Sequence, residues 1–569
     1  MTALLGKAAF HILFRDKKKK IARFLRTTTP DSVLSDLHTC LLREGIPSIT
    51  PQDIFHASSI RDSPQEQPYW TKKSFQTHLA RTHPDRTIPD TAINVLWSCF
   101  CFYAYYPFPL PGAGDKKLEL PAFERGFILL SLQGAWLLGN VDDGFGYSRG
   151  RTQEPCRCGF RINRIFRSIS LSSSDSPVAG SDTFITDDVI DALLPIFPAH
   201  PKLFPSIDKQ LKPLAERLLD GRTDQYQIKV NDLAALLGLL MRMKVYKPTW
   251  GRDFHYGSLE ESSPEKEELA NILARSFCLG QDEDLAPDSV LRALDILSNL
   301  EQWFHQLWTI LFQPFPSTET PTLEPECTPD PTMDGILRAA SLFIPPFEVH
   351  KRTDLARKVK PITFQKFYDS TSQTVTDSLD LGHILQPIFH NDVNRQSHLV
   401  LFLGHQAQDS KPVVVGAFFP SSSCTPTPAT TEANEPEPEE KMGETRPALP
   451  QLLFQLQPTF NLFRWTGEDT SISSSPECTS TSAREHTNPP SNYIGDPIRS
   501  KVGVAINSIT REATFLQGTA ATTAGNQISG GYEEVTRKHD DQPERKTTFT
   551  VTRLAIFSVE GGPRYDYPW

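Results

Sequence analysis

The sequence predicts an α+β protein, with a helical first half followed by a strand-rich second half. Up to about residue 312, apolar residues recur at steps of three or four, which is the spacing of a helix face. After a proline-rich stretch at 314–331, the pattern changes to short β-branched or aromatic runs bounded by Gly, Pro, Asn or Asp. Such runs are typical of strands. We therefore expect helices first and an antiparallel sandwich afterwards.

Composition supports folded units joined by spacers. The chain has 569 residues, among them 35 Phe and 8 Trp, enough for more than one buried core. Its 47 prolines are 8% of the residues, against a usual value of about 5%. This composition excludes fibrous, collagen-like and wholly disordered classes. The expected segments are a basic amphipathic segment at 1–30, a helical region at 31–140, a loop at 141–185, a helical region at 186–314, a linker at 315–335 and a strand-rich domain at 336–562.

The clearest predicted helix covers Asp288 to Phe312, where one apolar stripe recurs at steps of three or four. The predicted strands are seven short runs in the second half. They lie at 398–403, 413–419, 452–456, 461–465, 503–506, 514–516 and 548–559. Two insertions interrupt them, at 421–450 and 469–490. Both lack the apolar content needed to fold, so we expect them to be disordered.

Charge argues against nucleic acid as a partner. The chain holds 58 Lys and Arg against 68 Asp and Glu, a net charge of −10, whereas duplex-binding proteins usually have a basic balance or domain. The first 26 residues are the exception, because they interleave apolar residues with a basic cluster at Lys17, Lys18, Lys19 and Lys20. These four lysines are candidates for contact with an anionic membrane surface. A solvated first helix explains the same pattern, and both interpretations stay open.

The sequence holds no motif that points to catalysis, a metal or a cofactor. It lacks a phosphate-binding loop, an H-E-x-x-H pair, a G-x-S-x-G turn and a calcium loop, and its 15 histidines are scattered. We therefore expect a protein that is not an enzyme and has no cofactor. The alternative is an enzyme with an unrecognised hydrolase-like site in the sandwich. The nine dispersed cysteines form no disulfide framework, which favours a cytoplasmic location.

The strand-rich region resembles the TLDc domain of the oxidation-resistance protein family. The resemblance lies in the order of three segments: a strand ending Gly416-Ala-Phe418, then Leu453-Phe-Gln-Leu456, then Phe463-Arg-Trp465-Thr-Gly467. Later segments contribute Gly503 and Gly518. We expect Gly416 to permit a close approach within its strand, and Trp465 to share a face with Phe463 and fill the core. Where the family usually has a glycine-rich stretch near Ser500, this chain reads Asp-Pro-Ile-Arg-Ser-Lys.

The N-terminal half is similar to fungal TLDc proteins of the restriction-of-telomere-capping type. The matching segments are Tyr69 to Phe75 and Val95 to Pro109. The resemblance implies a degenerate EF-hand-like helical region and a non-enzymatic adaptor or regulator. Its implied partners are subunits of the vacuolar proton-pumping ATPase, with a role in oxidative-stress resistance and a genetic link to telomere capping. The implied location is cytoplasmic and peripheral at the vacuolar membrane.

Overall fold

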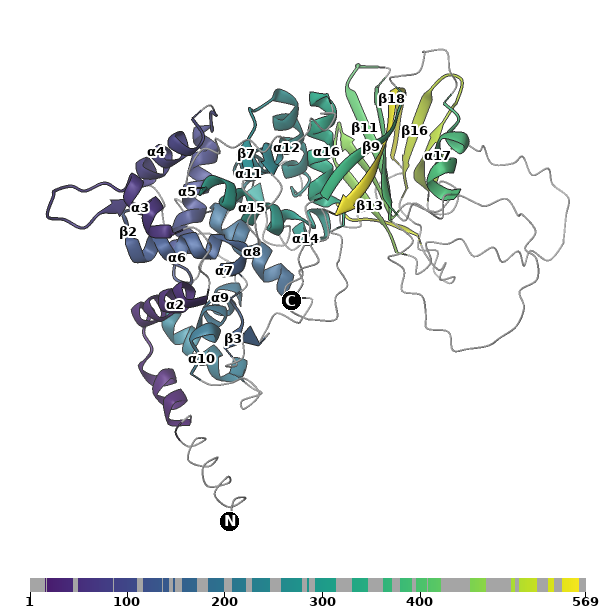
Figure 1. Cartoon of the computed structure of the whole chain (residues 1–569). Helices are drawn as coiled ribbons and strands as arrows, with labels where there is room; N and C mark the ends of the chain where they lie inside the picture. The colour runs from purple at the N-terminus through teal and green to yellow at the C-terminus, as the bar shows by residue number, and fades with distance from the viewer. Residues whose placement is uncertain are drawn as a thin grey trace, which may run out of the picture. The chain divides into compact units, whose positions relative to one another are not determined.

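A computed structural model of the chain divides into two compact units, residues 1–342 and 343–569, which we call the helical unit and the β-unit (Figure 1). Each unit is described by itself. The structure describes residues 16, 18–44, 50–84, 86–109, 116–135, 137–142, 147–148, 156–170, 183–198, 207–221, 228–245, 257–278, 284–285, 292–313, 330–345, 362–370, 379–390, 396–406, 408–420, 451–466, 493–496, 501–518, 531–536 and 545–561.

Helices dominate the first unit (Figure 1). They are α2 (Pro30–Glu44), α3 (Pro51–Ser58), α4 (Lys72–Thr82), α5 (Asp90–Ala104), α6 (Leu120–Leu130), α7 (Leu132–Ala135), α8 (Cys156–Ser170), α9 (Thr183–Leu193), η1 (Leu194–Ile196), α10 (Ile207–Leu219), α11 (Val230–Met241), α12 (Pro264–Arg275), α14 (Ala293–Ile296), α15 (Leu300–Leu311) and α16 (Pro331–Phe343). Four antiparallel pairs of short strands join them. These are β1 (Tyr69–Trp70) with β2 (Leu118–Glu119), β3 (Val141–Asp142) with β4 (Tyr147–Ser148), β5 (Ile228–Lys229) with β8 (Asp284–Leu285), and β6 (Met243–Val245) with β7 (Gly257–Leu259).

An aromatic cluster centred on α5 forms the core of the helical unit. Nearly every residue of α5 from Ala92 onward is buried, as its apolar sequence predicts. The ring of Phe100 lies 5.3 Å from Phe123 of α6, 5.4 Å from Phe312 after α15 and 6.4 Å from Phe75 of α4. Contacts between rings at these separations stabilise the core beyond the burial of apolar area alone. Phe100 therefore connects α5 to three segments that are distant in sequence.

The loop expected at 141–185 is wrong for its middle part, because α8 lies there. Four apolar residues at helical spacing, Ile162, Ile165, Phe166 and Ile169, are each at most 1% exposed. Arginines and serines between them hid this periodicity in the composition. Arg164 and Arg167 of α8 are buried too, and a buried arginine needs a charged partner that composition cannot reveal.

The single helix expected at 288–312 is also wrong, because the chain breaks between α14 and α15. Asn299 lies at the break, where its backbone N–H donates to the carbonyl of Leu342 at 3.1 Å and its side chain donates to the carbonyl of Ser341 at 2.8 Å. These bonds to the end of α16 replace the intrahelical bonds that an unbroken helix would make. The apolar stripe itself is buried, from Leu300 and Phe304 to Leu307 and Leu311.

The end of the expected linker at 335 also differs from the structure. Helix α16 begins at Pro331, and Asp330 accepts a hydrogen bond from the backbone N–H of Met333 at 3.0 Å, as an N-cap residue does. The helix continues to the boundary between the units, eight residues beyond the end of the expected linker. Its proline and threonine start resembles a linker, whereas its apolar face (Met333, Ile336 and Leu337) is buried.

The β-unit contains one ten-stranded antiparallel sheet and helix α17 (Leu381–His390). The strand order is β14-β15-β16-β18-β10-β11-β12-β13-β17, and β9 pairs with β18 in addition. The strands are β9 (Ile362–Asp369), β10 (Ser397–His405), β11 (Pro412–Phe419), β12 (Leu452–Gln457), β13 (Asn461–Trp465), β14 (Tyr493–Asp496), β15 (Val502–Ile506), β16 (Glu512–Gln517), β17 (Tyr532–Glu534) and β18 (Arg545–Gly561).

The two halves of this sheet pack against each other, so the expected sandwich is a single folded sheet. Phe463 of β13 and Phe515 of β16 lie far apart in the strand order, yet their ring centroids are 5.9 Å apart. Beside them the buried amide of Gln517 donates to the side-chain oxygen of Gln455 at 2.8 Å. Strands from both halves contribute to one apolar core.

All seven predicted strands are present in this sheet. Three further strands were not predicted: β9, β14 and β17. Strand β9 is largely exposed and polar apart from its aromatic residues, and β14 and β17 have only four and three residues. Such strands lack the apolar runs by which the others are recognised. The insertions expected at 421–450 and 469–490 lie outside the described residues.

The first prediction concerns Gly416, which pairs with Phe454 across β11 and β12. A Cβ at Gly416 would lie 2.2 Å from the tip of the Phe454 ring. We expect Gly416→Val to destabilise the β-unit by about 1–3 kcal/mol, the range for overpacking a core. Hydrogen–deuterium exchange of peptides from β11 and β12 measures this, as faster exchange.

Gly531→Ala is the matched control, because nothing lies within 4 Å of a Cβ built there. Phe454→Leu in the Gly416→Val background should recover part of the protection by making room. Unchanged exchange in Gly416→Val would contradict the close packing of this pair.

Candidate functional site

The motif residues of the second half lie within the sheet of the β-unit. Gly416 sits under the ring of Phe454, which confirms the expected close approach. Phe418 is 2% exposed and pairs with Leu399 on one side and Leu452 on the other. Both positions therefore serve packing between neighbouring strands.

Phe463 and Trp465 share one face of β13, as alternation predicts, but they differ in burial. Phe463 is 1% exposed, whereas Trp465 is only partly buried and packs at the margin of the core. The indole ring lies 5.2 Å from the ring of Tyr532 in β17, and its N–H has no hydrogen-bond partner among the described residues. The expectation that Trp465 fills the core is therefore corrected: it covers the edge of that core.

The later motif glycines also stand at close backbone contacts. Gly503 pairs with Gly495, which has a φ of +95°, and a Cβ on Gly495 would lie 3.0 Å from the Cα of Gly503. Gly518 donates its N–H to the carbonyl of Lys501 at 2.9 Å, and a Cβ there would lie 2.4 Å from the Cβ of Lys501. Gly467 lies outside the described residues. The motif positions thus maintain backbone approach.

The basic cluster at the N-terminus is largely exposed. Lys18, Lys19 and Lys20 belong to a helix that precedes α2, and Lys17 lies outside the described residues. Lys20 pairs with Asp16 at 3.4 Å, with both side chains more than 60% exposed. An exposed pair of this kind contributes little to stability, so the cluster keeps most of its positive potential.

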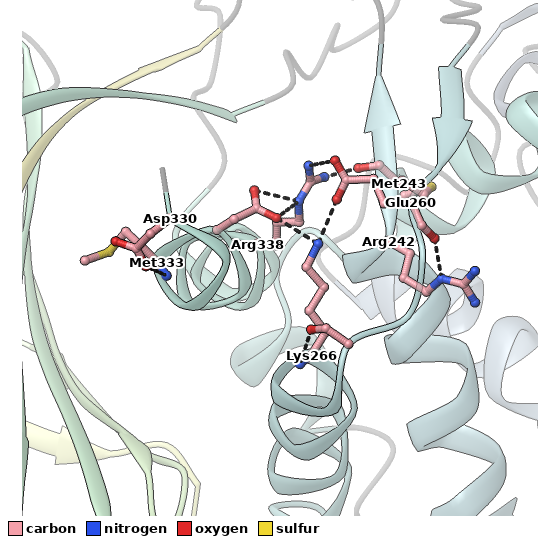
Figure 2. Close-up of polar contacts among 9 residues, drawn as sticks. Arg242, Met243, Glu260, Lys266, Asp330, Met333 and Arg338 are labelled. Atoms are coloured by element: carbon pink, nitrogen blue, oxygen red, sulfur yellow. Dashed lines mark hydrogen bonds and ion pairs between the residues drawn. The ribbon is translucent and has the colours of Figure 1, made fainter. Parts of the chain in front are cut away.

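A network of four charged side chains attaches α16 to the rest of the helical unit (Figure 2). The ammonium of Lys266, on α12, lies 2.7 Å from carboxylate oxygens of both Glu260 and Asp334. The guanidinium of Arg338 lies 3.0 Å from Asp334, one helical turn away, and 3.2 Å from Glu260. Arg338 also donates to the backbone carbonyl of Met243. Each of the two cations therefore contacts both carboxylates of the network.

The backbone and a neighbouring arginine position Glu260 within this network. Its N–H donates to the carbonyl of Arg242 at 2.8 Å, and the Arg242 guanidinium donates back to the Glu260 carbonyl at 2.7 Å. Figure 2 shows these contacts beside the strands at Met243. Ser263 caps α12 by accepting from the N–H of Lys266. Hydrogen bonds to neighbouring backbone groups and caps therefore fix the segments that carry Glu260 and Lys266.

Electrostatics within the network favour the ionised form of Asp334. Burial alone would raise the pKa of this carboxyl, but the charges and hydrogen bonds of Arg338 and Lys266 outweigh burial and hold the pKa below its ordinary value of 3.8. The side chain of Lys266 is only 8% exposed, so these contacts are poorly screened by solvent. The arrangement fastens α16 to α12 and to the segment at Glu260.

A second charged cluster lies deeper in the helical unit. Arg164 of α8 donates to Asp188 of α9 at 2.8 Å and also to Asp191, and Arg167 donates to Asp188 as well. The hydroxyl of Tyr106 donates to the Asp188 carboxylate at 3.1 Å. Burial raises the pKa of the Tyr106 hydroxyl well above its ordinary value of 10.0. All these groups are buried, so each depends on the others for its hydrogen bonds. The cluster joins α8 to α9.

Neither cluster was predicted from the sequence. The only sequence signal for the first was Asp334 and Arg338 at i and i+4, a spacing that places them on one helix face. Glu260 and Lys266 come from a distant segment, and no sequence spacing predicts that pairing. The arginines of α8 lie in a segment that was expected to be a loop, so the sequence did not predict their carboxylate partners on α9.

A histidine–carboxylate pair lies in the helical unit. His38 and the buried Glu124 lie 2.7 Å apart, but the other contact of Glu124 is the side-chain amide of Gln52, which is not a nucleophile. No group of three or more metal-ligating residues was found within the part of the chain that the structure describes. Nor did the helices described there include one long and apolar enough to cross a membrane.

Comparison with known proteins adds no family assignment. Neither the models of protein families nor the curated proteins include a match to this chain.

The second prediction is that Lys266 and Asp334 stabilise the helical unit together. We expect Lys266→Met and Asp334→Asn each to lower the free energy of unfolding, and the double variant to lose about 1–2 kcal/mol less than the sum of both. Urea unfolding followed by tryptophan fluorescence measures this, because six of the eight tryptophans precede residue 343. Additive effects would contradict direct coupling between the two charges.

The third prediction concerns pH and Asp334. Its pKa in the folded protein lies below 3.8, so its ionised form adds stability at neutral pH that is lost as pH falls through 3.8 toward the folded pKa. The difference in unfolding free energy between wild type and Asp334→Asn should therefore be present at pH 7 and shrink below about pH 4. A difference that grows on acidification would show that this carboxyl is not held ionised.

Proposed function

We propose that this protein is a TLDc-type adaptor or regulator that binds the vacuolar proton-pumping ATPase and contributes to oxidative-stress resistance. In this proposal the β-unit is the TLDc domain and the helical unit is its degenerate EF-hand-like partner region. The protein acts by binding other proteins and catalyses no reaction. It works from the cytoplasm, peripherally at the vacuolar membrane.

One observation carries the proposal: the motif segments that resemble the family come together in one sheet. Gly416 and Phe418 lie on β11 and Phe463 and Trp465 on β13, the two strands that pair with β12, and Gly503 lies in β15 of the same sheet. A chance similarity of short runs would not require that each run become a strand of the same sheet. This agreement supports the resemblance, and the function follows from the resemblance.

The construction of the β-unit also suits a binding domain. Its core is apolar and its strands are closely packed, so the sheet can hold surface loops in fixed positions. Hairpin turns at its margin are well ordered by local hydrogen bonds. In the turn between β15 and β16, the side-chain oxygen of Asn507 accepts the N–H groups of Ile509 and Thr510 at 3.0 and 3.1 Å. Ile509 at that tip is 86% exposed.

The fourth prediction tests the partner. Tagged protein incubated with detergent-solubilised vacuolar membranes should capture subunits of the proton pump, identified by mass spectrometry. At a temperature at which its β-unit is largely unfolded and that of wild type is not, the Gly416→Val variant should capture far less, whereas Gly531→Ala should capture as much as wild type. The Gly416→Val sample therefore sets the background for a misfolded sheet.

Recovery of pump subunits at equal levels with all three proteins would show that capture does not depend on the β-unit and would contradict the proposal. Absence of pump subunits from the wild-type sample would contradict it as well. Addition of the captured protein to purified pump, with ATP hydrolysis as the readout, then gives the sign of the regulation.

A further inference from the structure

The helix formed by residues 18–27 has two different faces. It precedes α2 at the purple end of the chain (Figure 1). One face packs on the helical unit: Ile21 is 5% exposed, and the ring of Phe24 meets the ring of Phe197 edge to face at 5.7 Å. The opposite face carries Lys19, Arg23 and Arg26, all exposed. Their spacing of i, i+4 and i+7 places the three cations in one row.

The helical unit fixes the orientation of this helix. Beyond Phe24, the carbonyl of Thr28 accepts a hydrogen bond from Arg217 of α10 at 3.2 Å, and Thr28 is 8% exposed. Ile21, Phe24 and Thr28 follow the helix repeat, so a continuous inner edge is anchored. The outer row consequently faces away from the unit. Binding of this ordered row loses less conformational entropy than binding of a flexible basic tail would.

The outer row, which we call the basic stripe (Lys19, Arg23 and Arg26), is charged without being amphipathic. None of its three cations forms an ion pair with a described residue, and Lys18 and Lys20 flank it. The apolar residues of the helix lie on its inner side: Ile21 is 5% exposed, and Phe24, which packs on Phe197, and Leu25 are partly buried. The stripe spans about 10 Å along the helix, since seven residues rise about 1.5 Å each.

We propose that the basic stripe binds the headgroups of an anionic lipid surface by charge alone, without insertion of apolar side chains. Several basic residues near such a surface attract it additively, whereas a protein interface usually has an aromatic or apolar anchor at its centre. The stripe offers cations and no anchor, which favours lipid headgroups over a protein partner. This proposal does not depend on which protein the β-unit binds.

Sedimentation of the full chain with vesicles tests the proposal. We expect binding to vesicles containing 30% phosphatidylserine in phosphatidylcholine at 50 mM salt, and none to pure phosphatidylcholine. The triple variant Lys19→Gln, Arg23→Gln, Arg26→Gln should bind about 100-fold more weakly, since each charge near an anionic surface contributes roughly fivefold. At 1 M salt wild-type binding should disappear, because the Debye length falls to about 3 Å.

A matched control changes the same number of charges elsewhere on the helical unit. Lys229, Lys244 and Arg275 are exposed and lie outside the helix, so their triple glutamine variant should bind like wild type. Phe24→Ala keeps every charge and should bind within about threefold of wild type. Circular dichroism and thermal unfolding of each variant establish that it is folded.

Three outcomes would overturn the proposal. Equal loss of binding in both triple variants would show that only net charge matters. Loss in Phe24→Ala as large as in the stripe variant would show that the charges of the stripe are not sufficient for binding. Binding of soluble polyglutamate or duplex DNA as tightly as the vesicles, at the same salt, would assign the stripe to a different macromolecule.

Discussion

The β-unit depends on the close approach of two strand backbones at Gly404. A Cβ there would lie 2.0 Å from the carbonyl oxygen of Thr550 and 2.9 Å from the ring of Phe549, so only glycine fits. The register between β10 and β18 shifts between Leu403 and Gly404. A bulge of this kind bends a strand and increases its twist. Strand β18 pairs with β16 before this point and with β9 after it, so the two parts of the sheet diverge here.

The helical unit solves a different problem, since its core must accommodate buried charges as well as aromatic rings. The cluster around Phe100 supplies non-directional burial, which tolerates many arrangements of the helices. The pairs of Arg164 with Asp188 and of Lys266 with Asp334 are directional, because an unpaired buried charge is costly. The charged pairs therefore favour particular helix faces for contact, while burial of apolar side chains, the aromatic cluster among them, stabilises the packed unit.

Elements that depend on interactions local in the sequence could be predicted, whereas elements that depend on contacts between distant segments could not. Seven of the strands between 398 and 559 were predicted because alternation and turn residues are local, and the burial of α5 followed from its apolar sequence. Helix α8 was missed because two of its arginines, Arg164 and Arg167, are buried against carboxylates of α9. The break at Asn299 was missed because its hydrogen bonds go to α16, about forty residues away in sequence. The partial exposure of Trp465 depends on β17, which is too short to recognise.

The residues that carry the family resemblance differ in position from the residues that are available to bind a partner. The motif residues that the structure describes lie at close contacts inside the sheet: Gly416 under Phe454, Phe418 between two strands, and Gly518 against Lys501. Substitutions there act on folding, so a loss of binding in such variants reports the loss of the scaffold. Recognition of a partner must come from exposed groups that the scaffold positions. Ile509 at its ordered turn in the β-unit and the basic stripe of the helical unit are groups of this kind, and neither belongs to the motif.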